Sequence, residues 1–208
     1  MRNLALSLLA CCLLLLPGGL SAAEEEGFRP LWNGKDLDGW EGRTDLWSVV
    51  DGAILGNSPG LKENHFLVTK EEFKNFELRF EVKLHEPSAN SGVQFWSQRV
   101  TDSTEMIGYQ ADIGPGYWGC IYDESRRRKM MAAPKPETVK EIVKDRAWNH
   151  YVVRAEGAKI TLAINGTETV SYVEEDAEIP RNGRFGLQVH SGGPFKIEFR
   201  NLRVKQLP

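Results

Sequence analysis

The stretch that decides the fold is Phe76-Glu77-Leu78-Arg79-Phe80-Glu81-Val82-Lys83-Leu84, in which apolar and charged residues alternate without a break. Because successive side chains of a β-strand point to opposite faces, this period of two predicts a strand with one buried face. Further strands are predicted at 47–55 (folded at Asp51-Gly52), 65–69, 92–97, 107–113, 148–155, 159–164, 168–173, 184–190 and 195–204. Clusters of Gly, Pro, Asn and Asp separate these runs at hairpin spacing.

Two local signals refine the strand pattern. Asn165-Gly166 predicts a type I′ hairpin turn, since both residues tolerate positive φ. The apolar parity moves from Ile197 and Phe199 to Leu202 and Val204, which predicts a β-bulge near residues 200–201. Helical periodicity is confined to the short stretches 70–73 and 138–143. Many short strands without a repeat or a linker predict an all-β domain, a two-sheet sandwich of jelly-roll type.

Composition limits the classes of partner. The 208 residues are 41% hydrophobic and 26% charged, with a net charge of −3, which indicates a folded globular domain. The only dense basic run, residues 126–129, is flanked by Asp123 and Glu124. Nucleic-acid binding requires a basic face that releases counterions, so no nucleic-acid partner is expected.

The amino terminus has the layout of a secretory signal. Arg2 precedes an apolar stretch at 4–16, and Ser21-Ala22-Ala23 follows as a small-residue cleavage site. We therefore expect a signal peptide over 1–23, a single domain over 24–208, a secreted or periplasmic location and no membrane association of the mature form. Cys120 is then the only thiol left, and we expect it to be a buried structural residue.

The polar faces of the predicted strands carry side chains suited to sugars. Parity assigns an outward direction to residues that combine bidentate hydrogen bonding with stacking, namely Arg79, Glu81, Gln94, Trp96, Gln110, Asp112, Gln188 and His190. Amides, an acid, a histidine and a tryptophan on several strands favour a carbohydrate groove, and an ordinary solvated sheet face is the alternative. An imidazole exchanges protons near neutral pH, so His190 is a candidate base, with Asp112 as its orienter or a second acid.

Two other chemistries find weaker support. Glu174-x-Asp176-x-Glu178 has the carboxylate spacing of some jelly-roll glucanases, but Glu175 and Ala177 intervene, which favours a solvated acidic loop. No metal-binding motif occurs. No cofactor is predicted, although a divalent ion could take ligands from separate strands, for instance Asp112 and His190.

Several motifs in a fixed order resemble one family. They include Pro30-Leu31-Trp32-Asn33-Gly34-Lys35-Asp36-Leu37, Asn90-Ser91-Gly92-Val93, Gly108-Tyr109-Gln110, Ile164-Asn165-Gly166 and Gly186-Leu187-Gln188-x-His190. Across the mature chain the sequence resembles the 3-keto-disaccharide hydrolase family. That resemblance implies a concanavalin-like jelly roll of the lectin and glucanase type, and cleavage of glycosides whose sugar is oxidised at C3. The substrate would be a small carbohydrate, an oxidised disaccharide or glycoside.

The implied mechanism gives roles to the outward residues. A ketone at C3 acidifies the C2 proton, so a base can form an enolate that expels the group at C1, after which water adds. His190 would be the base and Asp112 its orienter or a metal ligand. Substrate contacts would come from Arg79, Glu81, Gln94, Gln110 and Gln188, with Trp96 or Trp118 for stacking. The 117–127 segment departs from the usual family pattern, so Tyr122, Glu124 and Arg126 become candidates for substrate contact or proton donation. A noncatalytic sugar-binding module is the alternative function.

Overall fold

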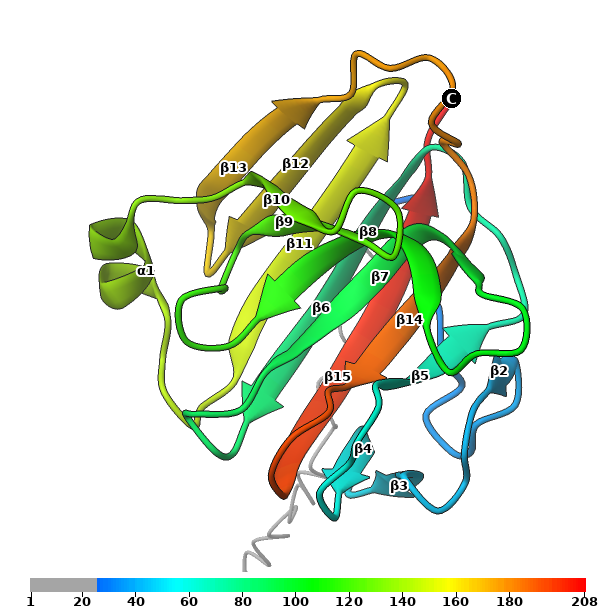
Figure 1. The fold of residues 1–208 in the computed structure, drawn as a ribbon, viewed down its shortest axis with the longest axis vertical. Helices are drawn as coiled ribbons and strands as arrows, with labels where there is room; N and C mark the ends of the chain where they lie inside the picture. Colours follow the sequence, from blue (N-terminus) through cyan, green and yellow to red (C-terminus); the bar gives the residue numbers. More distant parts are fainter. Residues whose placement is uncertain (1–25) are drawn as a thin grey trace, which may run out of the picture.

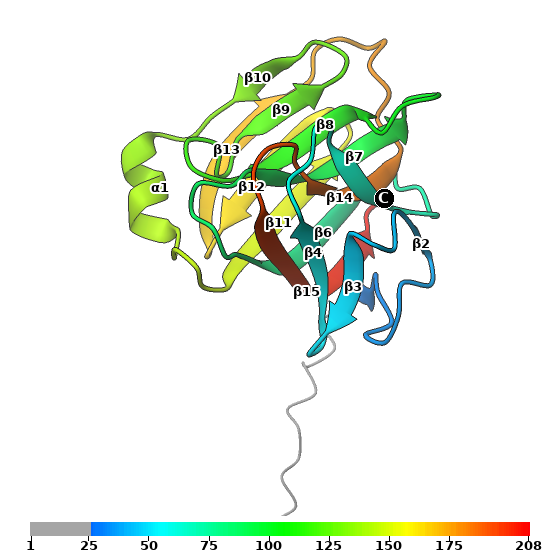
Figure 2. The ribbon, with the colours of Figure 1, turned by 60° about the horizontal axis from the view of Figure 1, so that its bottom comes forward.

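A computed structural model describes residues 26–208 as two antiparallel sheets packed face to face (Figure 1). The eight-stranded sheet A has the order β13 (Thr167–Val173), β12 (Lys159–Ile164), β11 (Asn149–Glu156), β6 (Phe76–Leu84), β15 (Phe195–Gln206), β4 (Ala53–Ser58) and β3 (Trp47–Val50), and β1 (Arg29–Pro30) pairs with β15. The seven-stranded sheet B has the order β10 (Lys129–Ala132), β9 (Ile121–Glu124), β8 (Met106–Ile113), β7 (Ser91–Arg99), β14 (Arg184–Val189), β5 (His65–Thr69) and β2 (Trp40–Glu41). The helix α1 (Pro136–Ile142) lies at one side of the sandwich (Figure 2). The all-β jelly-roll prediction is confirmed.

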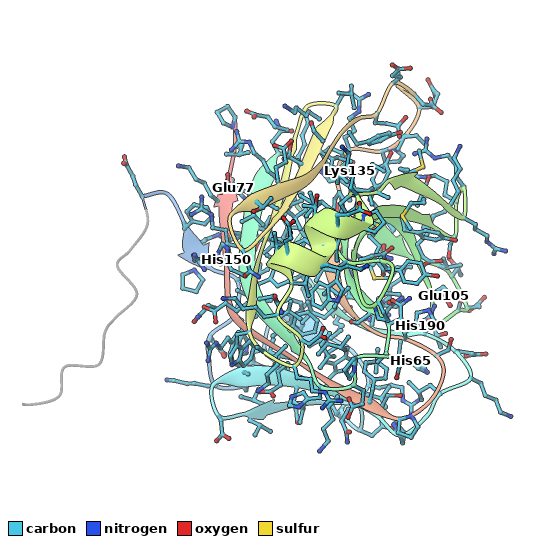
Figure 3. All side chains as sticks on the ribbon, turned by 90° about the vertical axis from the view of Figure 1, so that its left-hand side faces the viewer. His65, Glu77, Glu105, Lys135, His150 and His190 are labelled. Atoms are coloured by element: carbon cyan, nitrogen blue, oxygen red, sulfur yellow. The ribbon has the colours of Figure 1, made fainter. Side chains whose placement is uncertain are left out.

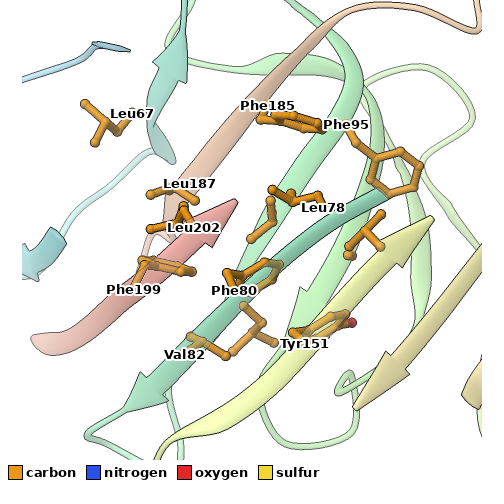
Figure 4. Close-up of a cluster of buried hydrophobic side chains, with 14 of the residues drawn as sticks. Leu67, Leu78, Phe80, Val82, Phe95, Tyr151, Phe185, Leu187, Phe199 and Leu202 are labelled. Carbon is orange, nitrogen blue, oxygen red and sulfur yellow. The ribbon is translucent and has the colours of Figure 1, made fainter. Parts of the chain in front are cut away.

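The core lies between the sheets and follows the alternation of β6. Phe76, Leu78, Phe80 and Val82 are buried there against residues of sheet B (Figure 4). The rings of Phe80 and Tyr151 stack with centroids 5.2 Å apart. Each fully buried side chain of this size contributes roughly 1.5–3 kcal/mol of hydrophobic stabilisation. The burial of these four side chains therefore determines which face of sheet A packs against sheet B.

The local predictions mostly agree with the backbone. Asn165 and Gly166 have φ values of 51° and 86°, as a type I′ turn requires. The register of β15 against β6 shifts between Arg200 and Arg203, which confirms the bulge. The helix starts two residues earlier than expected, and residues 70–73 form a bend and not a helical turn. The short strands β1, β2, β9 and β10 were not predicted.

The acidic stretch 174–178 is only partly solvated, which corrects the expectation of an exposed loop. Glu174 is 2% exposed and accepts hydrogen bonds from Arg127 Nη2 at 2.6 Å and Tyr172 Oη at 3.0 Å. Although burial opposes ionisation, Arg127 and Tyr109 hold the pKa of Glu174 at about 2. The carboxylate therefore ties β13 to sheet B as an ion-paired structural group, and a glucanase role for Glu174 and Glu178 loses its support.

Cys120 is buried as expected. The predicted signal segment, 1–23, lies outside the described residues. Over 26–208, no helix is long and apolar enough to cross a membrane.

Candidate functional site

The candidate site occupies the outer face of sheet B, over β7, β8, β9 and β14. Val93, Ala111 and Leu187 point into the core, so alternation turns Gln94, Gln110 and Gln188 to the other face. The register pairs Gln94 with Gln110 and Gln110 with Tyr122, which places these three side chains in one row across the sheet. The sequence prediction of a shared face is thus correct for Gln94, Gln110, Asp112 and Gln188.

A continuous chain of hydrogen bonds forms the floor of this site. Ser97 Oγ donates to Gln94 Oε1 at 2.7 Å, and Gln94 Nε2 donates to Gln110 Oε1 at 2.9 Å. Gln110 Nε2 in turn donates to Asp112 Oδ1 at 2.7 Å. These side chains are 0–3% exposed, so the chain holds both amides in fixed orientations.

Gln188 differs from its neighbours on the floor. It is completely buried, yet neither its amide nitrogen nor its amide oxygen has a hydrogen-bond partner among residues 26–208. An unsatisfied buried polar group costs about 1–3 kcal/mol. A ligand hydroxyl can both donate and accept, but it can reach these two inaccessible atoms only when the groups that cover Gln188 move aside.

Two carboxyl groups near the floor are shifted towards their neutral forms. Burial, together with the nearby Glu124 carboxylate, raises the pKa of Asp112 to about 8, and the hydrogen bond from Gln110 offsets this only in part. Burial and the Glu105 carboxylate also raise the pKa of Glu124. At neutral pH, Asp112 is therefore a protonated acid that can donate a hydrogen bond through its second oxygen.

His190 follows the last residue of β14 and is half-buried at the edge of the floor. Its Nδ1 lies 2.6 Å from the Ser191 carbonyl oxygen. A carbonyl can only accept, so Nδ1 carries a proton, and Nε2 is the ring nitrogen that can exchange a proton with a ligand. Ser191 N donates to Asn64 Oδ1 at 2.9 Å, and Asn64 Nδ2 donates to Glu105 Oε1 at 3.1 Å, which fixes the loop beside the histidine. Figure 3 places His190 and Glu105 at the same side of the molecule.

The predicted role of Asp112 as the orienter of His190 is wrong. The side-chain hydrogen bond of Asp112 goes to Gln110, and the Nδ1 of His190 is held by the Ser191 carbonyl. The neutral form of Asp112 also removes the negative charge that an orienting carboxylate would supply. The two side chains therefore have separate hydrogen-bond partners, Gln110 and the Ser191 carbonyl.

Trp96, Arg79 and Glu81 were assigned to the site incorrectly. The register of β7 shifts between Phe95 and Gln98, and Trp96 has a φ of 47°, so its ring turns into the core and its Nε1 donates to the Lys74 carbonyl. Arg79 and Glu81 lie on β6 in sheet A, where they pair with Glu77 and Arg200. Alternation distinguishes faces of a strand but does not say which sheet the strand joins.

The 117–127 segment contributes residues to more than one region. Tyr122 and Glu124 are half-buried on the site face of β9. Arg126 instead donates to Asp123 Oδ1 at 2.9 Å and lies 4.8 Å from the centroid of the Tyr109 ring, away from the floor. Trp118 is buried beside α1. Sequence reasoning missed Ser97, Asn64 and Glu105, because a bulge and two loops bring them to the site.

No group of three or more His, Cys, Asp or Glu residues within 26–208 could hold a metal ion. The two donors that the sequence offered for a divalent ion, Asp112 and His190, are therefore not joined by a third such donor in this part of the chain. No step below uses a metal ion.

The floor depends on the absence of a side chain at Gly92. A Cβ there would lie 2.5 Å from Cγ and Cδ of Gln110, closer than real contacts allow. We expect Gly92→Ala to displace Gln110 and interrupt the series of side-chain hydrogen bonds in the floor. The free energy of unfolding should fall by about 1–3 kcal/mol in urea titrations. Gly193→Ala is the matched control, since its Cβ would meet no atom within 4 Å. Equal stability of the two variants would contradict this account of the floor.

Comparison with known proteins gives this arrangement a family. A family described as the 3-keto-alpha-glucoside-1,2-lyase-like domain matches residues 27–205. The chain belongs to this family. The resemblance inferred from the sequence motifs is therefore confirmed. No curated protein matches the chain.

Solved structures agree with the fold of this 3-keto-glucoside lyase-like domain. A candidate glycosyl hydrolase from Parabacteroides distasonis superposes with a TM-score of 0.68 at 21% identity, covering 88% of this chain and 95% of that one. The carbohydrate-binding module CBM66 from Bacillus subtilis has a TM-score of 0.64 at 16% identity, covering 84% and 98%. SCLam, a non-specific endo-β-1,3(4)-glucanase of family GH16, has a TM-score of 0.56 at 10% identity, covering 88% and 92%. At these identities the likeness establishes the concanavalin-like fold alone.

Proposed function

We propose that the protein is a carbohydrate-active enzyme that cleaves 3-keto-glycosides by elimination followed by addition of water. The family match supports this choice of substrate class. The observation that carries it is the floor itself: Gln188 is buried with both amide atoms unpartnered, beside a fixed chain of amides that ends on Asp112. His190 stands on the same strand end with its Nε2 lone pair available.

In the proposed reaction His190 Nε2 removes the C2 proton of the bound 3-keto sugar. The electron pair of the C–H bond forms a C2–C3 double bond, and the charge moves to the C3 oxygen as an enolate. The enolate oxygen needs fixed hydrogen-bond donors, and protonated Asp112 and the free amide of Gln188 are placed on one face for that purpose.

In the second half of the reaction the enolate collapses and the C1–O bond breaks. The leaving oxygen takes a proton from an acid, for which we propose Glu124, whose pKa is raised by burial and by Glu105. The products are a C1–C2 unsaturated 3-keto sugar and the free alcohol. Water then adds across the C1–C2 double bond: its hydroxyl group bonds to C1, its proton returns to Glu124, and the proton held by His190 returns to C2. The net reaction is hydrolysis, with both residues restored.

The alternative function is a noncatalytic sugar-binding module. It is favoured by one specific likeness, the superposition with CBM66, whose fold is shared over most of both chains. A binding module would use the same polar floor without turnover.

The deciding experiment incubates the purified protein with a glucoside and with its 3-keto derivative, with and without a chelator. We expect release of the aglycone from the keto compound only, because the unoxidised sugar has no acidic C2 proton. Release from both compounds would point to ordinary glycoside hydrolysis. Binding of either compound without release would favour the sugar-binding module, and loss of release with the chelator would show a metal requirement that the residues above do not explain.

A further inference from the structure

A separate cavity of about 590 Å³ opens beside α1, at the end of the sandwich where the β6–β7 and β8–β9 turns meet the helix. Figure 3 shows α1 and the strands next to it from this side. Its walls are largely apolar and include Pro87, Pro115, Pro134, Pro136, Trp118 and Val139. A cavity of this volume and lining is of the size that holds a small organic molecule.

The helix side of the cavity is held rigidly. Asn149, which is 1% exposed, accepts from Lys144 N at 2.8 Å and donates to the carbonyls of Lys144 and Ala147 at 2.9 and 3.0 Å. Asn165 donates to the Ile142 carbonyl at 2.7 Å. Prolines further limit the backbone of the surrounding turns. A preformed wall reduces the ordering cost of ligand binding.

The rim of the cavity is positively charged. Lys140, Lys144 and Arg146 line it and are exposed, and Asp145 is the single acid among the lining residues. None of the three cations forms an ion pair with another residue of the described chain. Glu137 and Glu141 also lie on α1, but they do not line the cavity. An apolar interior whose rim carries three cations and one acid is complementary to a molecule that has a flat apolar body and one anionic group.

The cavity adjoins the candidate site through Cys120. Cys120 is one of the residues that line the cavity, and its carbonyl accepts a hydrogen bond from Asp112 N at 3.0 Å. Burial raises the pKa of the thiol to about 12, and the neighbouring Asp112 carboxylate adds to the shift. One backbone hydrogen bond therefore links a residue of the floor to a residue of the cavity wall. The inert thiol itself supplies no chemistry.

We propose that this cavity is the leaving-group subsite and that it selects an apolar, anionic aglycone such as an aryl carboxylate. The assignment rests on the proposed function, because it needs a glycoside whose sugar occupies the floor over Gln94, Gln110 and Gln188. The aglycone then extends past Asp112 towards Trp118, with its anionic group at Lys140 and Lys144.

Binding is tested first, without catalysis. The probe is 8-anilinonaphthalene-1-sulfonate, an aromatic anion whose fluorescence rises in apolar sites, titrated into the intact protein. We expect a single site that the double variant Lys140→Glu/Lys144→Glu weakens at least tenfold. Lys70→Glu, an exposed charge reversal outside the cavity lining, is the matched control and should bind like the parent. Unchanged binding in the double variant would overturn the assignment.

Selectivity is tested second, with 4-carboxyphenyl and 4-carbamoylphenyl 3-keto-glucosides. The selectivity is the kcat/KM for the carboxylate substrate divided by the kcat/KM for the amide substrate. We expect this ratio to exceed one in the parent and to be at least tenfold smaller in the double variant. Comparing ratios between proteins cancels the difference in leaving-group chemistry. If both proteins cleave both substrates with the same selectivity, the leaving-group subsite is refuted while the proposed function stands. No cleavage of either substrate refutes the proposed function and the leaving-group role, while lysine-dependent probe binding would still identify an anion site.

Discussion

His190→Gln should reduce the turnover of 3-keto-glycosides by about 10²–10⁴-fold while leaving substrate binding within a few-fold of the parent. Glutamine keeps a polar side chain of similar reach but has no basic lone pair with which to remove the C2 proton. The Nδ1 of the ring is hydrogen-bonded to the Ser191 carbonyl, so Nε2 is the atom whose loss the substitution tests. Rates come from aglycone release at saturating substrate, and binding comes from calorimetry with the unoxidised glucoside.

His85→Gln is the control for this result. His85 pairs with Glu198 on sheet A, so its loss should leave turnover unchanged. A His190→Gln enzyme that turns over at the parental rate would remove the base from the mechanism. Equal loss of binding and turnover would instead mean that His190 only shapes the floor.

The sequence predicted which side chains of a strand point into the core, but it did not predict to which of the two sheets the strand belongs. The unbroken alternation of 76–84 fixed the core side of β6, and the same parity placed Gln94, Gln110, Asp112 and Gln188 together. Parity failed at Trp96, where an irregular register reverses the direction of the ring. It also could not separate Arg79 from Gln94, because strand pairing depends on contacts distant in sequence.

The details that give the site its chemistry lie in such distant contacts. Glu105 reaches Glu124 and Asn64 through a loop, and the raised pKa of Asp112 depends on burial that no short motif encodes. The same limit hid the pairing of Glu174 with Arg127, because the sequence predicted a solvated loop at 174–178. Residue type and parity can therefore nominate groups for a site, while protonation states need the packed structure.

Asp112→Asn should raise the free energy of unfolding relative to the parent, by an amount that grows as the pH rises. The same substitution should remove the activity. The folded-state pKa of Asp112, about 8, lies well above the ordinary value of an aspartate, so between pH 4 and pH 8 the unfolded chain has released a proton that the folded chain retains. Stability contributed by the neutral acid is complete below pH 4 and falls as the pH rises to 8. The asparagine variant lacks this loss, and its advantage at pH 7 is of the order of 4 kcal/mol.

Urea unfolding of both proteins between pH 4.5 and pH 8.5 measures this difference, and comparing the variant with its parent cancels the titration of all other groups. The two curves should meet near pH 4.5 and separate upwards, whereas Asp45→Asn, at an exposed carboxylate, should follow the parent throughout. Curves that stay parallel would mean that Asp112 is ionised in the folded protein. An acid that destabilises the fold at neutral pH, next to an unpartnered buried amide, is suited to binding an enolate oxygen. The stabilised variant should therefore also be the inactive one.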